Sequence, residues 1–90
     1  MQEPRFAKNP DLHVEDMDPE ILLYERGSHR TIYLNETAAV VWKLCDGTRT
    51  LADVVGLLSD HYPEAGTALA LEVEQTVEML LREGALSAEL

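Results

Sequence analysis

The chain has 90 residues, of which 46% are hydrophobic, and a formal net charge of −10. This length supports one domain with a modest core and leaves no room for a second domain. From residue 50 onward, Arg82 is the only basic residue against eight carboxylates. An acidic surface repels a phosphate backbone and attracts basic groups. The composition therefore argues against nucleic-acid binding, and it suits either simple solubility or a basic or neutral peptide partner.

The sequence predicts neither a membrane segment nor a secreted protein. The longest apolar run, 38–42, is far too short to cross a bilayer. The first ten residues are polar and charged, unlike a secretion signal. Cys45 is the single cysteine, so no internal disulfide can form. We therefore expect a cytoplasmic protein with no membrane contact.

Residues 1–10 are predicted to form a flexible N-terminal arm. Pro4 and Pro10 interrupt this stretch, and Phe6 is its only candidate anchor to the rest of the chain. The remaining residues, 11–90, are expected to form the single domain.

Strand patterns fill the first half of this domain. Leu12, Val14 and Met17 are apolar with polar residues between them, which indicates a half-buried strand, and 21–24 is an apolar run typical of a second strand. A hairpin loop at 26–29 leads to a return strand at 30–34. The prediction is a small antiparallel sheet of two or three strands.

Two capped helices follow the strands. Asn35 is a favourable N-cap for a helix over 36–45, and Gly47 is suited to end that helix. Thr50, with an aspartate three residues later, has the capping-box pattern that begins a helix over 51–61.

A third helix closes the domain. Pro63 and Gly66 interrupt the chain, and Thr67 can then cap a helix that runs to about residue 83. Its inner face is predicted to consist of Leu69, Val73, Val77 and Leu80. The tail, 85–90, is compatible with a short extended piece. Strands followed by three short helices predict an α+β domain, specifically a winged helix-turn-helix.

No catalytic arrangement of residues is recognisable. The three histidines have no partners at metal-ligand spacing. Cys45 follows an apolar helix face with no histidine nearby, so we expect a core residue and not a nucleophile. There is neither a glycine-rich phosphate loop nor an Asp-Ser-Leu attachment site of an acyl carrier protein. We therefore expect a protein that is not an enzyme and that holds no metal or cofactor.

The remaining feature is the open edge of the predicted sheet. Along the return strand, Ile32 and Leu34 share one face, while Thr31 and Tyr33 share the other. An extended peptide can add to such an edge as an extra strand, with affinity from main-chain hydrogen bonds. The peptide would lie along 30–34, beside the third helix. The alternative is that the N-terminal arm or a second copy of the chain covers this edge.

Several motifs, in order, resemble the PqqD family. The resemblance begins at Tyr33-Leu34-Asn35-Glu36-Thr37-Ala38-Ala39 and continues with Trp42-Lys43-Leu44-Cys45-Asp46-Gly47 and Arg49-Thr50-Leu51. It extends through Tyr62-Pro63 and ends at Arg82-Glu83-Gly84-Ala85-Leu86. With the strand region that precedes these motifs, the resemblance as a whole covers roughly 12–86, which is nearly the whole chain.

The resemblance implies a non-catalytic peptide adaptor. Proteins of this kind bind the leader of a ribosomally made precursor peptide and present it to a modifying enzyme, often a radical S-adenosylmethionine enzyme, as in the synthesis of pyrroloquinoline quinone. The leader is expected as an added strand, in the groove between the third strand and the third helix. On this chain, the implied peptide-binding residues are Arg30, Thr31, Ile32, Tyr33, Leu34, Leu69, Val73, Thr76, Val77 and Leu80.

Two alternatives belong to other classes. A winged-helix transcription regulator would fit the helix count, but a DNA reader needs Lys and Arg on its recognition helix. The second helix has neither residue, and the third has only Arg82. The other alternative is an interaction module with no peptide client, such as a homodimer that closes its own sheet edge.

Overall fold

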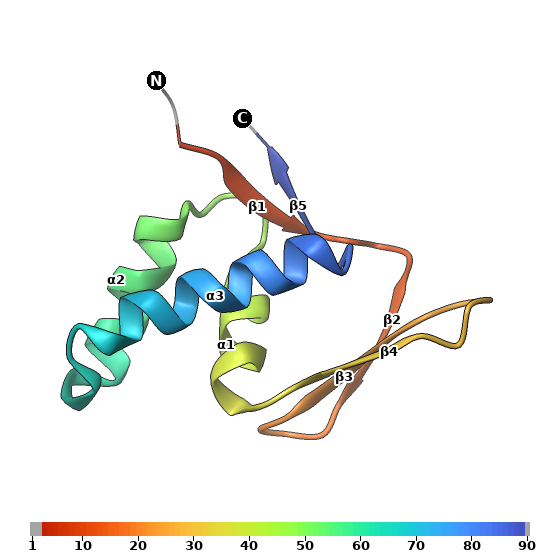
Figure 1. The fold of residues 1–90 in the computed structure, drawn as a ribbon, viewed down its shortest axis with the longest axis horizontal. Helices are drawn as coiled ribbons and strands as arrows, with labels where there is room; N and C mark the ends of the chain where they lie inside the picture. Colours follow the sequence, from red (N-terminus) through yellow and green to blue (C-terminus); the bar gives the residue numbers. More distant parts are fainter. Residues whose placement is uncertain (1–2, 90) are drawn as a thin grey trace.

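The computed structural model describes residues 3–89 of the chain. The fold consists of three α-helices, a three-stranded sheet and a separate strand pair. Figure 1 shows that this strand pair lies near the two ends of the chain, apart from the main sheet. In chain order the elements are β1 (Arg5–Lys8), β2 (Leu12–Asp16), β3 (Ile21–Glu25), β4 (Thr31–Leu34), α1 (Glu36–Leu44), α2 (Leu51–His61), the 3-10 turn η1 (Pro63–Ala65), α3 (Ala68–Arg82) and β5 (Leu86–Glu89). Antiparallel sheets combined with three α-helices confirm the predicted α+β class.

The main sheet has the strand order β2-β3-β4, with β3 in the centre. Both neighbours pair with β3 in antiparallel fashion, so β2 and β4 are the two edges. One face of this sheet contributes Ile21, Leu23 and Leu34 to the core, each fully buried. The sequence predicts a small antiparallel sheet of two or three strands, and the structure has three.

A second sheet, β1 with β5, differs from the arm predicted for residues 1–10. Phe6 is only 6% exposed and lies opposite Ala88. Its backbone N–H donates to the carbonyl of Arg49 at 3.2 Å, and Gly47 N donates to the carbonyl of Phe6 at 2.7 Å. Burial of one aromatic ring, together with this pairing, holds residues 5–8 as a strand. Residues 1, 2 and 90 lie outside the described residues, and the mobility of the arm stays a prediction.

Side-chain caps begin the first two helices, which confirms both predicted caps. The Asn35 side chain accepts from Ala38 N at 2.9 Å. At α2, Thr50 Oγ1 accepts from Asp53 N at 3.2 Å and Asp53 accepts from Thr50 N at 3.0 Å, so the capping box is complete. The cap predicted at Thr67 is wrong in its chemistry, since that side chain makes no capping hydrogen bond. The chain instead enters α3 through η1 and Gly66, whose φ is +65°.

The helix α3 is the central packing element of the fold. It contacts α1, α2 and β5, and in Figure 1 it runs from the end of α2 toward the two sheets. Its inner face, the predicted row Leu69, Val73, Val77 and Leu80, is at most 3% exposed. β4 leads directly into α1, and α1 packs against α3. The end of β4 therefore lies beside α3. Across residues 3–89, no helix is both long and apolar enough to span a bilayer.

Candidate functional site: an open strand edge beside α3

The outer edge of β4 has no strand beside it among residues 3–89. Glu25 N donates to the carbonyl of Arg30, its opposite residue, at 3.0 Å. Bonded and non-bonded pairs alternate along an antiparallel ladder, so Ile32 also directs its backbone groups toward β3. The N–H and C=O groups of Thr31 and Tyr33 therefore face the open edge. The edge thus presents the main-chain groups of these two residues away from β3.

The side chains of β4 alternate as the sequence predicts. Ile32 is 8% exposed and Leu34 is fully buried, whereas Thr31 is exposed and Tyr33 is 55% exposed. Residues 5–8 do not cover this edge, because β1 pairs with β5. The edge and its exposed tyrosine are therefore accessible along the described part of the chain.

A cleft of about 310 Å³ lies between β4 and α3. One wall comes from the end of β4 and the start of α1, and the other from the middle of α3. The lining residues are Tyr33, Asn35, Ala38, Glu72, Gln75, Thr76 and Met79. The cleft thus extends from the open edge of β4 to the surface of α3.

Most polar groups at this cleft already have partners. The Tyr33 hydroxyl donates to the carboxylate of Glu20, and this hydrogen bond is the main reason why the pKa of Tyr33 is raised above its ordinary value. Thr76 Oγ1 donates to the carbonyl of Glu72 at 2.9 Å. Asn35 is occupied by its cap. In contrast, the carboxylate of Glu72 has neither a hydrogen bond nor an ion pair within residues 3–89.

Thr76 is the only one of the five predicted α3 residues that lines the cleft. The other four, Leu69, Val73, Val77 and Leu80, are buried in the core, and their contact with a peptide stays a prediction. The side chains that α3 presents at the cleft are Glu72, Gln75, Thr76 and Met79. They form a helical row next to the apolar one, since their spacing of three and four residues keeps them on one side. The spacing of these four residues was the only feature of the sequence that could have identified them as one surface of α3.

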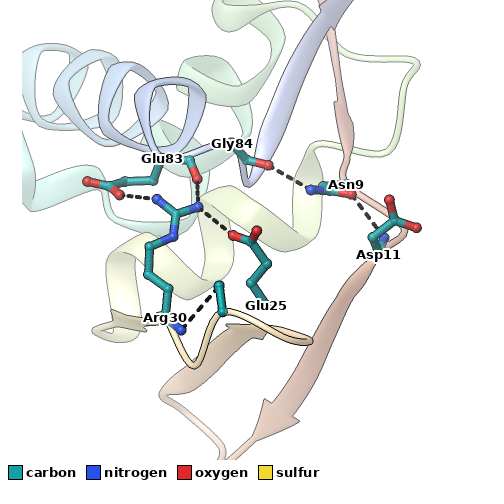
Figure 2. A network of polar contacts seen from close by, with 7 residues as sticks. Asn9, Asp11, Glu25, Arg30, Glu83 and Gly84 are labelled. Carbon is teal, nitrogen blue, oxygen red and sulfur yellow. Dashed lines mark hydrogen bonds and ion pairs between the residues drawn. The ribbon is translucent and has the colours of Figure 1, made fainter.

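Arg30 joins the hairpin to the end of α3, as Figure 2 shows. Its guanidinium forms an ion pair with Glu83 at 2.8 Å and another with Glu25 at 3.0 Å. It also donates to the backbone carbonyl of Glu83. A cation at this place also complements the partial negative charge of the helix C-terminus. This predicted site residue therefore has its charge fully engaged.

Further hydrogen bonds bring the β1–β2 connection to the same place. Asn9 Nδ2 donates to the carbonyl of Gly84 at 2.9 Å, and Asp11 N donates to the side chain of Asn9 at 2.9 Å (Figure 2). Gly84 has a φ of +77°, a backbone conformation that glycine adopts without strain. The C-terminal end of α3 is thus hydrogen-bonded both to the hairpin and to the β1–β2 connection.

Two other places among residues 3–89 are weaker candidates for a site, the single cysteine and a hollow on α2. Burial raises the pKa of the Cys45 thiol to about 11, so the group is protonated at neutral pH. Within the described residues, no group of three His, Cys, Asp or Glu side chains could hold a metal ion. A wider hollow of about 610 Å³ lies on α2, but its Arg49 pairs with Asp46 and its Asp53 belongs to the cap. The β4 edge is the stronger candidate.

Comparison with known sequences gives a consistent result. A family model described as "Coenzyme PQQ synthesis protein D (PqqD)" matches residues 20–86. A PqqA binding protein of Klebsiella pneumoniae is 39% identical over 49 residues, covering 54% of this chain and 50% of the relative. A PqqA binding protein of Rahnella aquatilis is 36% identical over 62 residues, covering 69% and 55%. The chain spans about half the length of these curated relatives.

Two solved structures share the fold. The structure of TbiB1 in complex with the TbiA(beta) leader peptide gives a TM-score of 0.76 at 12% identity, over 90% of this chain and 94% of that chain. The heterocyclase TruD gives a TM-score of 0.68 at 16% identity, over 94% of this chain but only 11% of that chain. At these identities the likeness is one of fold. The same arrangement of elements therefore occurs both as a small separate chain and as a small part of a large one.

Proposed function

The chain belongs to the PqqD family, and on this premise we propose that it is a non-catalytic adaptor for a ribosomally made precursor peptide. It binds the leader of that peptide and presents it to a modifying enzyme, of the radical S-adenosylmethionine class or another class. The observation that carries the proposal is the open edge of β4 beside the α3 cleft.

The names of the relatives support a peptide client. Two of the sequence relatives are PqqA binding proteins, and TbiB1 has the same fold and was solved with a leader peptide. The family match also includes β4, the cleft and all of α3. A precursor leader is thus the partner that best accounts for an unpaired edge at this place.

The leader would bind as a fourth strand of the main sheet. Its main chain would pair with the outward N–H and C=O groups of Thr31 and Tyr33. Leader residues on either side of the one paired with Tyr33 would share the face of Ile32 and Leu34, and so would point toward α3. Main-chain pairing supplies affinity for any extended segment, whereas the cleft supplies the choice between sequences.

The same proposal includes the finer description of the fold. We assign the domain to the winged helix-turn-helix class, with α2 and α3 as the helical pair and the β2-β3-β4 sheet as the wing. α2 carries no Lys or Arg, so this pair is poorly suited to DNA. A cytoplasmic location, expected from the single cysteine, belongs to the proposal as well.

A proline at position 31 tests strand addition directly. Thr31→Pro removes an N–H that faces the open edge, and proline is tolerated in an edge strand where its missing N–H would face solvent. We expect the dissociation constant for the leader to rise about tenfold, through one lost main-chain hydrogen bond and local displacement. Thr31→Ala, which keeps the N–H, should bind like the parent protein. The measurement is calorimetric titration with the synthetic leader of any precursor peptide that is encoded near the gene for this chain.

Amide NMR on the same samples separates the outcomes. Shifts concentrated at 31–33 and along the cleft row of α3 are expected when leader is added. Ile32→Pro is the folding control, because that N–H faces β3 and its loss should destabilise the sheet. Equal leader affinity for Thr31→Pro and Thr31→Ala, with both proteins folded, would refute strand addition at this edge.

A further inference from the structure

The α3 cleft offers a single charged group to a ligand. Glu72 is the only ionisable residue of α3 among its lining residues, and it is exposed at the rim. Two other lining residues are apolar and shielded from solvent: Ala38 is only 8% exposed and Met79 is half-buried. No Lys or Arg lines the cleft. The lining thus combines apolar side chains with one carboxylate that has no partner among the described residues.

We propose that this cleft selects a Lys or Arg side chain of the leader, with Glu72 as the specificity-determining residue. The inference rests on the proposed function, since it names the side chain that the bound strand places here. The aliphatic stem of a basic residue would lie on Ala38 and Met79, while its charged group reaches the Glu72 carboxylate. An acidic leader residue would be rejected at this place by repulsion.

Other nearby carboxylates are less available than Glu72. Glu83 and Glu25 are paired with Arg30, and Glu20 accepts from the Tyr33 hydroxyl. On α3 itself, Glu78 is exposed but does not line the cleft. Of these carboxylates, only Glu72 both lacks a hydrogen bond or ion pair among the described residues and lines the cleft beside β4.

The position of the selected residue in the leader follows from the sheet. The cleft includes Asn35 and Ala38, so it lies at the end of β4 where Leu34 is found. A leader residue opposite Leu34 shares the core-side face and points toward α3. The basic residue should thus be the immediate neighbour of the one that pairs with Tyr33.

Selection from a library of random displayed peptides tests the inference without a known client. The library is selected against the parent protein, Glu72→Lys and Glu78→Lys, the last two having the same net charge. We expect peptides enriched by the parent and by Glu78→Lys to carry Lys or Arg at one fixed position. Glu72→Lys should lose that preference and bind the parent's best peptide about tenfold more weakly, while Glu78→Lys should bind it within about twofold.

Three results are informative. Loss of the basic preference in Glu72→Lys alone supports the inference. If enriched peptides depend on the β4 edge, as shown by loss of binding to Thr31→Pro, but have no fixed basic residue, the inference is wrong and the proposed function stands. If no peptide is enriched by the parent protein, both the adaptor proposal and the inference fail.

Discussion

The two ends of the groove between β4 and α3 differ in whether their charges have partners. At the end of α3, Arg30 is shared by two carboxylates and a backbone carbonyl. At the middle of α3, Glu72 faces the cleft with no partner in the described chain. Arg30 lies just before β4 and contacts the C-cap of α3, whereas Glu72 lies within α3 and lines the cleft at the other end of β4. The charge at one end is therefore engaged within the fold, and the charge at the other end has no partner among the described residues.

This comparison separates stability from recognition along one groove. A partnered charge in a folded protein contributes to stability, whereas an unpartnered exposed charge contributes almost nothing until a ligand arrives. Arg30 links the residues before β4 to the C-terminal end of α3, and these contacts are present without a ligand. A leader that enters a preformed groove loses less free energy to ordering than one that must first assemble it.

The largest expected effect is on stability, at the partnered end. Arg30→Ala should lower the free energy of unfolding by about 2 kcal/mol, because it removes two half-exposed ion pairs and a hydrogen bond to the helix end. Glu72→Ala should change it by less than about 0.5 kcal/mol, as is usual for an exposed site. Urea unfolding of both variants measures the difference. Equal losses would show that the two ends do not have separate roles.

Much of this fold could be predicted because its signals are local. The caps at Asn35 and Thr50 need only residues three positions apart, and the hairpin at 26–29 needs only a loop between apolar strands. The strand at 30–34, with side chains that alternate between its two faces, could also be predicted from residues close together in the sequence. The predicted edge could thus be located from the sequence, apart from Arg30, which the structure places just before β4.

The rest depended on contacts between distant residues. Strand β1 exists because Phe6 is buried and pairs with Ala88, more than eighty residues away, and only its aromatic ring hinted at an anchor. The cleft row of α3 was missed because an apolar stripe marks what is buried, not what borders a ligand. Glu72 looks like any solvent-facing carboxylate until β4 is placed beside it.

A smaller effect is expected from the helix cap within the cleft. Asn35→Ala removes the side chain that accepts from Ala38 N and should cost about 1 kcal/mol of stability. Thr50→Ala, at the cap of α2, should cost a similar amount and is the matched control. Only Asn35→Ala should also weaken leader binding, since Thr50 does not line the cleft. Equal leader affinities in the two variants would show that Asn35 does not contribute to leader binding at the cleft.

The smallest expected effect is a change in the pKa of Tyr33, which lines the cleft. The pKa of Tyr33 is raised chiefly because its hydroxyl donates to Glu20, and burial and the negative charge of Glu20 act in the same direction. A phenol with a raised pKa contributes stability at lower pH, and this is lost as pH rises through the pKa of the folded protein. Glu20→Gln should lower the pKa of Tyr33 toward its ordinary value, measurable by NMR of the labelled ring with Tyr24 as reference. An identical midpoint in both proteins would mean that Glu20 does not hold this side chain at the strand edge.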